Sequence, residues 1–256
     1  MENTKYTCGG NQIANKLFTN STRTISISLL VLVSTVLAGC MSIHTAARAG
    51  NLGEVKRQLA WGVNPNTRTF WYLNTPLHGA SAYGRIRVVK LLLAKGADVN
   101  KGNEGSKRPL HYAARHGHTK VMKILLEHGA KVTAKDKSGW ITPGWKTPLK
   151  SAAGNGQIEA AKLLLAYGAD INEPSGGTRD TPLYSAVFYN QIEMVIFLLA
   201  NGANVNIKSQ GCTALHLSYQ KKYEEIARVL LEHGADPNIE CRGYKIPQSF
   251  LRQLHK

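Results

Sequence analysis

Thr75-Pro76-Leu77-His78, followed by Leu91-Leu92-Leu93-Ala94-Lys95-Gly96-Ala97-Asp98-Val99-Asn100, is one copy of a unit that returns along the chain. The glycine in the second half of the unit marks its register, and successive copies are 34, 33, 39, 34 and 32 residues apart. The register glycines are Gly62, Gly96, Gly129, Gly168, Gly202 and Gly234. A near-constant period of this length is typical of repeat architectures, in which each copy is one supersecondary unit. The sequence therefore predicts about six stacked units rather than a single globular core.

Each unit contains start and stop signals for two helices. The hydroxyl of Thr75 is suited to cap a backbone N–H, and Pro76 to the first helical position, where no N–H is needed. A glycine such as Gly84 then ends the first helix. The second helix has an apolar stripe of the kind seen in 88–93, Val-Val-Lys-Leu-Leu-Leu. An extended finger is predicted between this helix and the next threonine.

The unit resembles the ankyrin repeat, and the resemblance extends from about Met41 to Glu240. It implies an all-α ankyrin-repeat solenoid of helix-turn-helix units with extended finger loops. We expect residues 40–240 to form this domain and 241–256 to form a C-terminal capping segment. The expected units start near residues 42, 75, 108, 147, 181 and 213.

The first unit lacks the Thr-Pro pair, as expected for a terminal cap, and four further positions at the starts and ends of the first helices depart from the pattern. Arg108 replaces the capping threonine of the third unit, and Ala214 replaces the proline of the sixth. Asn190 and Lys222 stand where the other units have the glycine that ends the first helix.

Residues 1–39 have the layout of a secretory signal. Three basic residues precede an apolar run of 13 residues at 25–37, which is shorter than the ~18–20 residues that span a bilayer. The segment closes on Leu37-Ala38-Gly39-Cys40, which resembles the lipobox of bacterial lipoproteins and implies cleavage before Cys40 and acylation of that residue. The alternatives are an uncleaved anchor, or an ordinary apolar helix with an incidental cysteine.

The expected location bears on how the charge is interpreted. Met41 follows the cysteine, and by resemblance to sorted lipoproteins the absence of Asp there favours the outer membrane, facing the periplasm. Removal of residues 1–39 would leave 29 basic and 15 acidic residues, a net charge of about +14. A periplasmic location excludes nucleic acid as the partner. The charge then fits an acidic protein or an anionic membrane surface, or it only solvates the helix faces.

Two cysteines, Cys212 and Cys241, follow Cys40 and lie on neighbouring fingers. Adjacent units should be ~10 Å apart, whereas a disulfide needs Cα atoms within ~7 Å. An offset within the fingers would shorten that distance, so the sequence leaves a bridge open.

The sequence contains no catalytic constellation. In ankyrin proteins the histidine of the repeat ties neighbouring units together, and this resemblance assigns a structural role to His44, His78, His111 and His216. The pair His116-Gly117-His118 has no cysteines or paired carboxylates at metal-ligand spacing. We therefore expect no enzyme, no metal and no cofactor.

The resemblance implies that binding uses the finger tips and the concave face of the first helices. Two fingers carry unusual aromatic residues: the one ending at Thr75 and the one, six residues longer, ending at Thr147. The predicted protein-binding residues are Phe70, Trp71, Tyr72, Tyr83, Lys107, Arg115, His116, Trp140, Ile141, Trp145, Lys146, Phe188 and Tyr189. The alternative is that the finger aromatics fold onto neighbouring fingers and fill gaps.

A role that fits bacterial ankyrin lipoproteins is immunity. The chain would be a monomer until it binds a secreted antibacterial toxin, such as a type VI phospholipase, and would plug the toxin's active-site cleft with a finger. Two alternatives remain: a periplasmic scaffold supporting an envelope or oxidative-stress enzyme, and an adaptor on anionic membrane surfaces.

Overall fold

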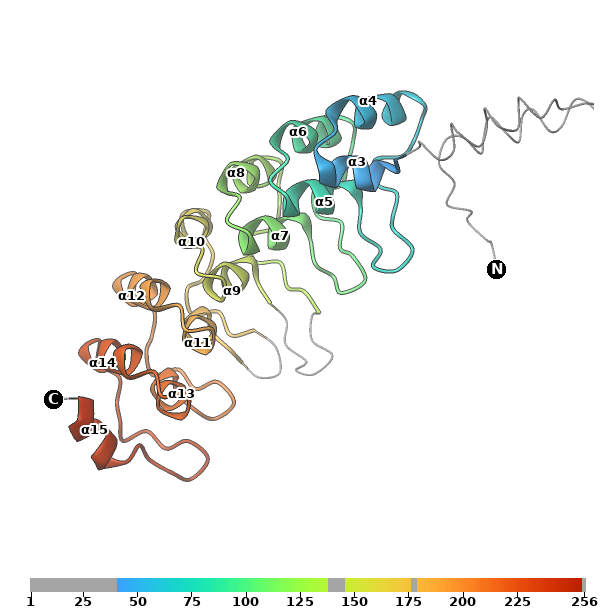
Figure 1. Cartoon of the computed structure of the whole chain (residues 1–256). Helices are drawn as coiled ribbons and strands as arrows, with labels where there is room; N and C mark the ends of the chain where they lie inside the picture. The colour runs from blue at the N-terminus through green and yellow to red at the C-terminus, as the bar shows by residue number, and fades with distance from the viewer. Residues whose placement is uncertain (1–40, 138–145, 176–178, 255–256) are drawn as a thin grey trace, which may run out of the picture.

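The computed structural model describes residues 41–137, 146–175 and 179–254, and these residues form two rows of short helices (Figure 1). The first row contains the first helix of each unit: α3 (Ile43–Ala49), α5 (Pro76–Ala82), α7 (Pro109–Arg115), α9 (Pro148–Ala153), α11 (Pro182–Phe188) and α13 (Ala214–Lys221). The second row contains α4 (Leu52–Ala60), α6 (Ile86–Ala94), α8 (Thr119–Glu127), α10 (Ile158–Ala166), α12 (Ile192–Ala200) and α14 (Glu224–Glu232). A final helix, α15 (Gln248–Leu254), packs against α14. The predicted all-α solenoid of six helix pairs is confirmed.

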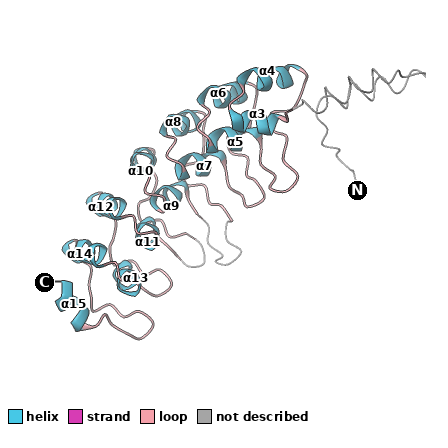
Figure 2. Cartoon of the chain, in the orientation of Figure 1, coloured by secondary structure: helices cyan, strands magenta, loops and turns pink. Residues whose placement is uncertain are grey.

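The fingers extend from the side of the first row, so that helices and loops alternate along the stack (Figure 2). Asparagine side chains join neighbouring fingers at their bases. Asn66 donates to the carbonyl of Gly96 (2.9 Å) and accepts from the N–H of Asp98 (2.7 Å). Asn100 makes the equivalent pair of bonds one unit later. The fingers are therefore cross-linked in sequence order.

The predicted threonine cap is present at two helix starts, whereas the hydroxyls of Thr75 and Thr213 lie 2.8 Å from Nδ1 of their own repeat histidines. Thr147 Oγ1 accepts from the N–H of Lys150, and Thr181 Oγ1 accepts from the N–H of Tyr184, both at 3.1 Å. Arg108 has no such oxygen, but its N–H donates to Nδ1 of His111 (3.2 Å). The Thr75 N–H makes the same bond to Nδ1 of His78 (3.0 Å), so the repeat histidine takes part in the helix start with or without the threonine.

The two residues that replace glycine keep the glycine conformation. Gly84 has φ of 64°, and Asn190 and Lys222 have φ of 55° and 58°. Residues with a Cβ pay about 1–2 kcal/mol in this left-handed region, least for asparagine. The packing of the two helices therefore requires a left-handed residue between them, even where that residue has a Cβ.

The core runs along the whole stack between the two rows. First helices contribute alanines with no exposed surface, such as Ala80 and Ala113, together with at least one buried leucine each from α5 on, and second helices contribute most of the other large side chains. The largest fully buried side chains are Leu77, Leu92, Leu110, Met122, Leu125, Leu149, Leu164, Leu183, Met194, Leu198, Leu215 and Ile226. Each fully buried leucine contributes about 1.5–3 kcal/mol, and the total is shared by units that contact only their neighbours.

The bridge between Cys212 and Cys241 is present in the structure. Each cysteine lies in a tight four-residue loop that is closed by an antiparallel backbone bridge. Cys212 is the last residue of the loop closed by Ser209 and Cys212, and Cys241 is the first residue of the loop closed by Cys241 and Tyr244. This offset brings their Cα atoms to 4.4 Å, well inside the spacing of the units themselves. The disulfide therefore joins the last two fingers.

Cys40 and the segment predicted as a signal lie outside the described residues.

Within residues 41–137, 146–175 and 179–254, every helix is too short or too polar to cross a bilayer.

Candidate protein-binding surface

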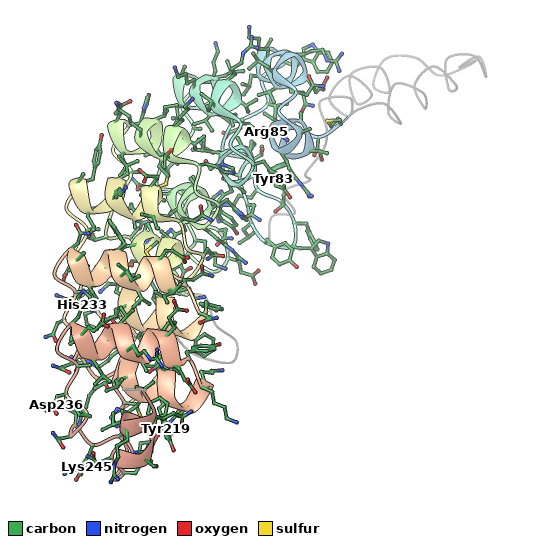
Figure 3. The ribbon with its side chains drawn as sticks, turned by 60° about the vertical axis from the view of Figure 1, so that its left-hand side comes forward. Tyr83, Arg85, Tyr219, His233, Asp236 and Lys245 are labelled. Atoms are coloured by element: carbon green, nitrogen blue, oxygen red, sulfur yellow. A yellow bond between two sulfur atoms is a disulfide. The ribbon has the colours of Figure 1, made fainter. Side chains whose placement is uncertain are left out.

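The inner face of the solenoid is the surface formed by the first-row helices and the fingers. Figure 3 shows the second-row helices along the outer side of the stack, with Tyr83 away from that side, near the first finger. Two groups of predicted binding residues lie on the inner face, one near each end.

The first group is at the tip of the first finger. The exposed fractions of Phe70, Trp71 and Tyr72 are 74%, 78% and 68%. The alternative that these three side chains fill gaps between fingers is therefore wrong. Their function in binding stays a prediction.

Hydrogen bonds hold this tip in a fixed shape. Thr69 N–H donates to the carbonyl of Asn74 (2.9 Å), and Asn74 N–H donates to Thr69 Oγ1 (3.1 Å). The next finger supports it, because Glu104 N–H donates to the Tyr72 carbonyl (3.1 Å) and Asn103 Nδ2 donates to Asn74 Oδ1 (3.0 Å). The three aromatic rings are thus presented on an ordered loop.

A groove of about 370 Å³ lies between this tip and helices α3, α5 and α7. Trp71, Tyr72, Tyr83 and Tyr112 contribute aromatic walls, and Arg48 places its guanidinium 4.9 Å from the centre of the Tyr83 ring. We call this the aromatic groove. It offers a partner apolar surface with one cation at its edge.

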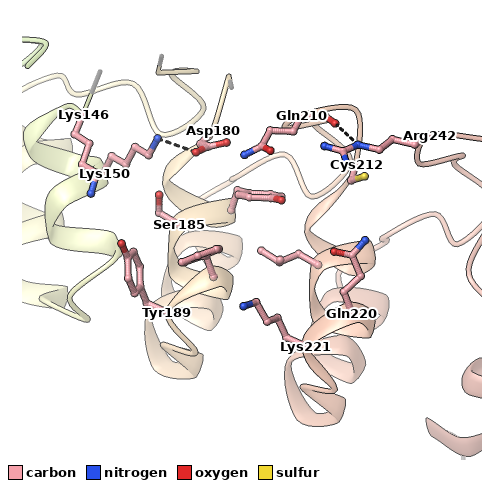
Figure 4. Close-up of a pocket in the computed structure, with 13 residues that line it drawn as sticks. Lys146, Lys150, Asp180, Ser185, Tyr189, Gln210, Cys212, Gln220, Lys221 and Arg242 are labelled. Atoms are coloured by element: carbon pink, nitrogen blue, oxygen red, sulfur yellow. Dashed lines mark hydrogen bonds and ion pairs between the residues drawn. The ribbon is translucent and has the colours of Figure 1, made fainter. Parts of the chain in front are cut away.

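The second group surrounds a pocket of about 350 Å³ between α9, α11 and α13 (Figure 4). We call it the basic pocket, and its charged lining residues are Lys146, Lys150, Asp180, Lys221 and Arg242. Phe188 and Tyr189 also line it, with their ring centres 5.0 Å apart and edge to face. Lys221 Nζ lies 4.9 Å from the centre of the Phe188 ring.

Lys150 is a site residue that the sequence analysis did not single out. It occupies the repeat's histidine position, and its side chain is only 5% exposed. Its Nζ lies 3.3 Å from Asp180 Oδ2, while Asp180 Oδ1 accepts from Ser209 Oγ. Burial lowers the pKa of the Lys150 ammonium, and the Asp180 carboxylate opposes that shift. The sequence feature that could have identified Lys150 is the lysine in Thr147-Pro148-Leu149-Lys150, at the position where other units have histidine.

The histidines at the repeat position contact the finger that follows them in all four units that have one. His44 lies 3.0 Å from the carbonyl of Thr67, His78 2.9 Å from that of Lys107, and His111 3.0 Å from that of Lys146. His216 contacts Thr213 of its own unit, and its ring lies edge to face with that of Tyr244 in the next finger, with the ring centres 5.8 Å apart. Burial lowers the pKa of His78 to about 4, so this imidazole is neutral.

The remaining predicted residues are divided between the described part of the chain and the rest. Lys107 and Arg115 line a smaller pocket of about 140 Å³, which shares Lys146, Lys150 and Tyr189 with the basic pocket. His116 is exposed beside them. Trp140, Ile141 and Trp145 lie outside the described residues.

In the part that the structure describes, no three His, Cys, Asp or Glu side chains are grouped to hold a metal ion.

Comparison with known proteins identifies the repeats. A family model described as ankyrin repeats (3 copies) matches residues 43–136 and 149–241, and a second ankyrin-repeat model matches 110–165. The human ASB11 ankyrin repeat domain is similar in structure, with a TM-score of 0.72 and 29% identity over 84% of this chain and 96% of that one. The ARF GTPase-activating protein Git of Drosophila melanogaster is 38% identical over 69 residues, which are 25% of this chain and 9% of that protein.

Ankyrin repeats act as protein–protein interaction modules, and the fold is typically a binding scaffold without catalytic activity. The repeat register, the paired helices and the matched models lead to one conclusion, that this chain belongs to the ankyrin-repeat family.

Proposed function

We propose that this chain is a membrane-anchored periplasmic protein that neutralises a secreted antibacterial toxin by inserting the tip of its first finger into the toxin's cleft. The observation that carries the proposal is the trio Phe70, Trp71 and Tyr72, exposed on an ordered tip beside the aromatic groove. Exposed apolar clusters generally mark binding sites, and aromatic residues dominate interface hot spots. Because the tip is hydrogen-bonded in place, little conformational entropy is lost when it binds.

Export and anchoring are supported by two features. The tetrapeptide that ends at Cys40 resembles a lipobox, and the Cys212–Cys241 disulfide is of a kind that persists in oxidising compartments such as the periplasm. Acyl chains on Cys40 would hold the protein at the outer membrane. An inhibitor held there meets a lipid-attacking toxin, such as a type VI phospholipase, where that toxin acts.

A periplasmic scaffold for an envelope or oxidative-stress enzyme is the second candidate. The pockets are spread along the inner face from α3 to α13, and this favours the scaffold. A binding surface of that length can hold the components of an assembly as well as a single toxin. The neighbouring genes separate the two. A lipase gene beside a secretion-spike gene supports immunity, and a catalase-type gene supports the scaffold.

The test measures binding to the toxin encoded beside this gene, and survival of cells that produce both proteins. Replacing Phe70 and Trp71 by alanine should weaken toxin binding by about 30-fold or more and abolish protection. The matched control is Trp61→Ala at the end of α4, because Trp61 is 50% exposed but lines none of the three pockets.

Three results would count against the proposal. Unchanged affinity in the Phe70/Trp71 double variant would remove the first finger as the plug. Equal losses in the Trp61 variant would show a general effect on folding. Labelled palmitate that enters wild type and a Cys40→Ala variant equally would remove the anchor. A further double variant, Trp140→Ala with Trp145→Ala, asks whether the long finger takes part.

A further inference from the structure

The basic pocket exists because the fourth unit departs from the histidine pattern. In the second and third units, His78 and His111 bond a carbonyl of the following finger. Lysine has three donors and no acceptor, so the Lys150 side chain cannot accept the backbone N–H of Thr147 as Nδ1 of His78 accepts that of Thr75. Its ammonium instead reaches into the pocket, toward Asp180 (Figure 4).

The charges around the pocket do not balance. Four cationic side chains line it against a single carboxylate, that of Asp180. This carboxylate is already shared, because its two oxygens contact Lys150 Nζ and Ser209 Oγ. An anion that entered would therefore meet a field of excess positive charge in a partly enclosed space, where charge-assisted hydrogen bonds are strongest.

The wall of the pocket that carries Arg242 is held in position. Arg242 follows Cys241, whose disulfide partner Cys212 also lines the pocket. The Arg242 guanidinium also makes a long contact from its Nε to the Gln210 carbonyl, at 3.4 Å. An arginine held in this way is suited to a planar carboxylate.

The pocket also has an apolar side that a free ion would not use. Phe188 and Tyr189 are 45% and 51% exposed, and both belong to its lining. Tyr189 continues into the smaller pocket that Lys107 and Arg115 line. The combined surface carries cations, aromatic rings and the carboxylates of Asp136 and Asp180, and this extended arrangement suits a chain segment better than a single small anion.

We propose that the basic pocket binds an acidic segment of the protein partner, with Asp or Glu carboxylates facing Lys146, Lys150 and Arg242 along the pocket and an adjacent apolar side chain against Phe188 and Tyr189. This inference rests on the proposed function and adds the chemistry of the partner. The aromatic tip supplies affinity at one end of the inner face, and the basic pocket selects an acidic partner at the other.

The experiment selects a random peptide library displayed on phage against the purified full-length protein. Recovered peptides should be enriched in Asp or Glu beside an apolar residue. In fluorescence anisotropy, a recovered peptide should bind at least tenfold more weakly when its acids are replaced by Asn or Gln. The affinity should also fall as salt rises, because the contact is ionic.

Two variants of the protein should weaken the same peptide at least tenfold. One is Lys146→Glu with Arg242→Glu, and the other is Lys150→His, which restores the repeat residue and so protects the fold. The matched control is Lys90→Glu with Lys123→Glu, which makes the same change in net charge at exposed positions of α6 and α8. The control should bind within twofold of wild type.

The proposal is overturned if the recovered peptides lack acids, or if their amide forms bind equally well. It is also overturned if phosphatidylglycerol vesicles, and no peptide, bind with this dependence on Lys146 and Arg242, since the site would then be a lipid site. If the pocket variants keep wild-type affinity for the toxin while the Phe70/Trp71 variant loses it, the pocket proposal fails and the proposed function stands. If instead the pocket variants lose affinity for the toxin and the Phe70/Trp71 variant keeps it, the pocket proposal stands and insertion of the first finger is ruled out.

Discussion

The Nε2 atom of His78 lies 2.9 Å from the carbonyl oxygen of Lys107, so one buried imidazole joins the second unit to the finger that leads into the third. On the other side of the ring, Nδ1 accepts from the Thr75 N–H at 3.0 Å. These contacts fix the neutral ring with its proton on Nε2. A charged imidazolium would lose the acceptor at Nδ1 and would be buried besides.

Acid should therefore destabilise the protein before its carboxylates titrate. The folded pKa of His78 is about 4, below its ordinary value of 6.5, so between these values the unfolded chain binds more protons. Stability should be complete above pH 6.5 and fall as the pH decreases toward 4, by up to about 3 kcal/mol from His78 alone. Urea unfolding at a series of pH values measures this. A His78→Gln variant should show a shallower slope, and equal slopes would contradict the assignment.

Replacing Lys222 by glycine should stabilise the sixth unit. Lys222 has φ of 58°, where a Cβ is unfavourable, so Lys222→Gly should raise the free energy of unfolding by about 1 kcal/mol. Lys221→Gly, inside α13, is the control and should lower it by a similar amount. Urea unfolding compares the two. If Lys222→Gly destabilises as much as Lys221→Gly, the left-handed turn is not under strain.

Removing the disulfide should loosen the C-terminal end selectively. The bridge closes a loop with a sequence separation of 29, for which chain entropy gives about 3.5 kcal/mol. A variant with Cys212→Ser and Cys241→Ser should lose this stability mainly in the last two fingers, because solenoid units contact only their neighbours. Hydrogen exchange should be faster in α13 to α15 and unchanged in α3 to α6. Uniformly faster exchange would refute this.

The asparagines between fingers should matter only where a following unit is present. Asn100→Ala removes bonds to the Gly129 carbonyl and the Lys131 N–H, and should reduce stability by about 1–2 kcal/mol. Asn238 has the same place in the last register, and its backbone N–H, which alanine would keep, donates to Asp236 Oδ1 of its own turn. Asn238→Ala should change stability by less than about 0.5 kcal/mol. Thermal unfolding of both variants checks this, and equal losses would contradict it.

The helix pairs were predictable because their signals are local. Thr147 and Pro148 mark a helix start within a few residues, and the structure places α9 there. The disulfide was not predictable, because the spacing of units gives the separation of fingers and not the offset of Cys212 and Cys241 within them. That offset depends on two tight loops of four residues.

The binding surface was predictable in part. The resemblance indicated finger tips and first helices, and the structure leaves Phe70, Trp71 and Tyr72 exposed on the inner face. Lys150 was missed, because its partner Asp180 is 30 residues away and the pair forms only when two units stack. A residue whose role depends on the next unit cannot be assigned from its own repeat.

The histidines are unevenly placed along the stack, and this has a mechanical consequence. They occupy the repeat position in the first three units and in the sixth, whereas Lys150 and Tyr184 occupy it in the fourth and fifth. Protonation of these imidazoles would fray the solenoid from both ends toward its middle. The fourth and fifth units, which carry Lys150, Asp180 and Tyr189, would be the last to separate, whereas the α13 side of the basic pocket would open together with the sixth unit.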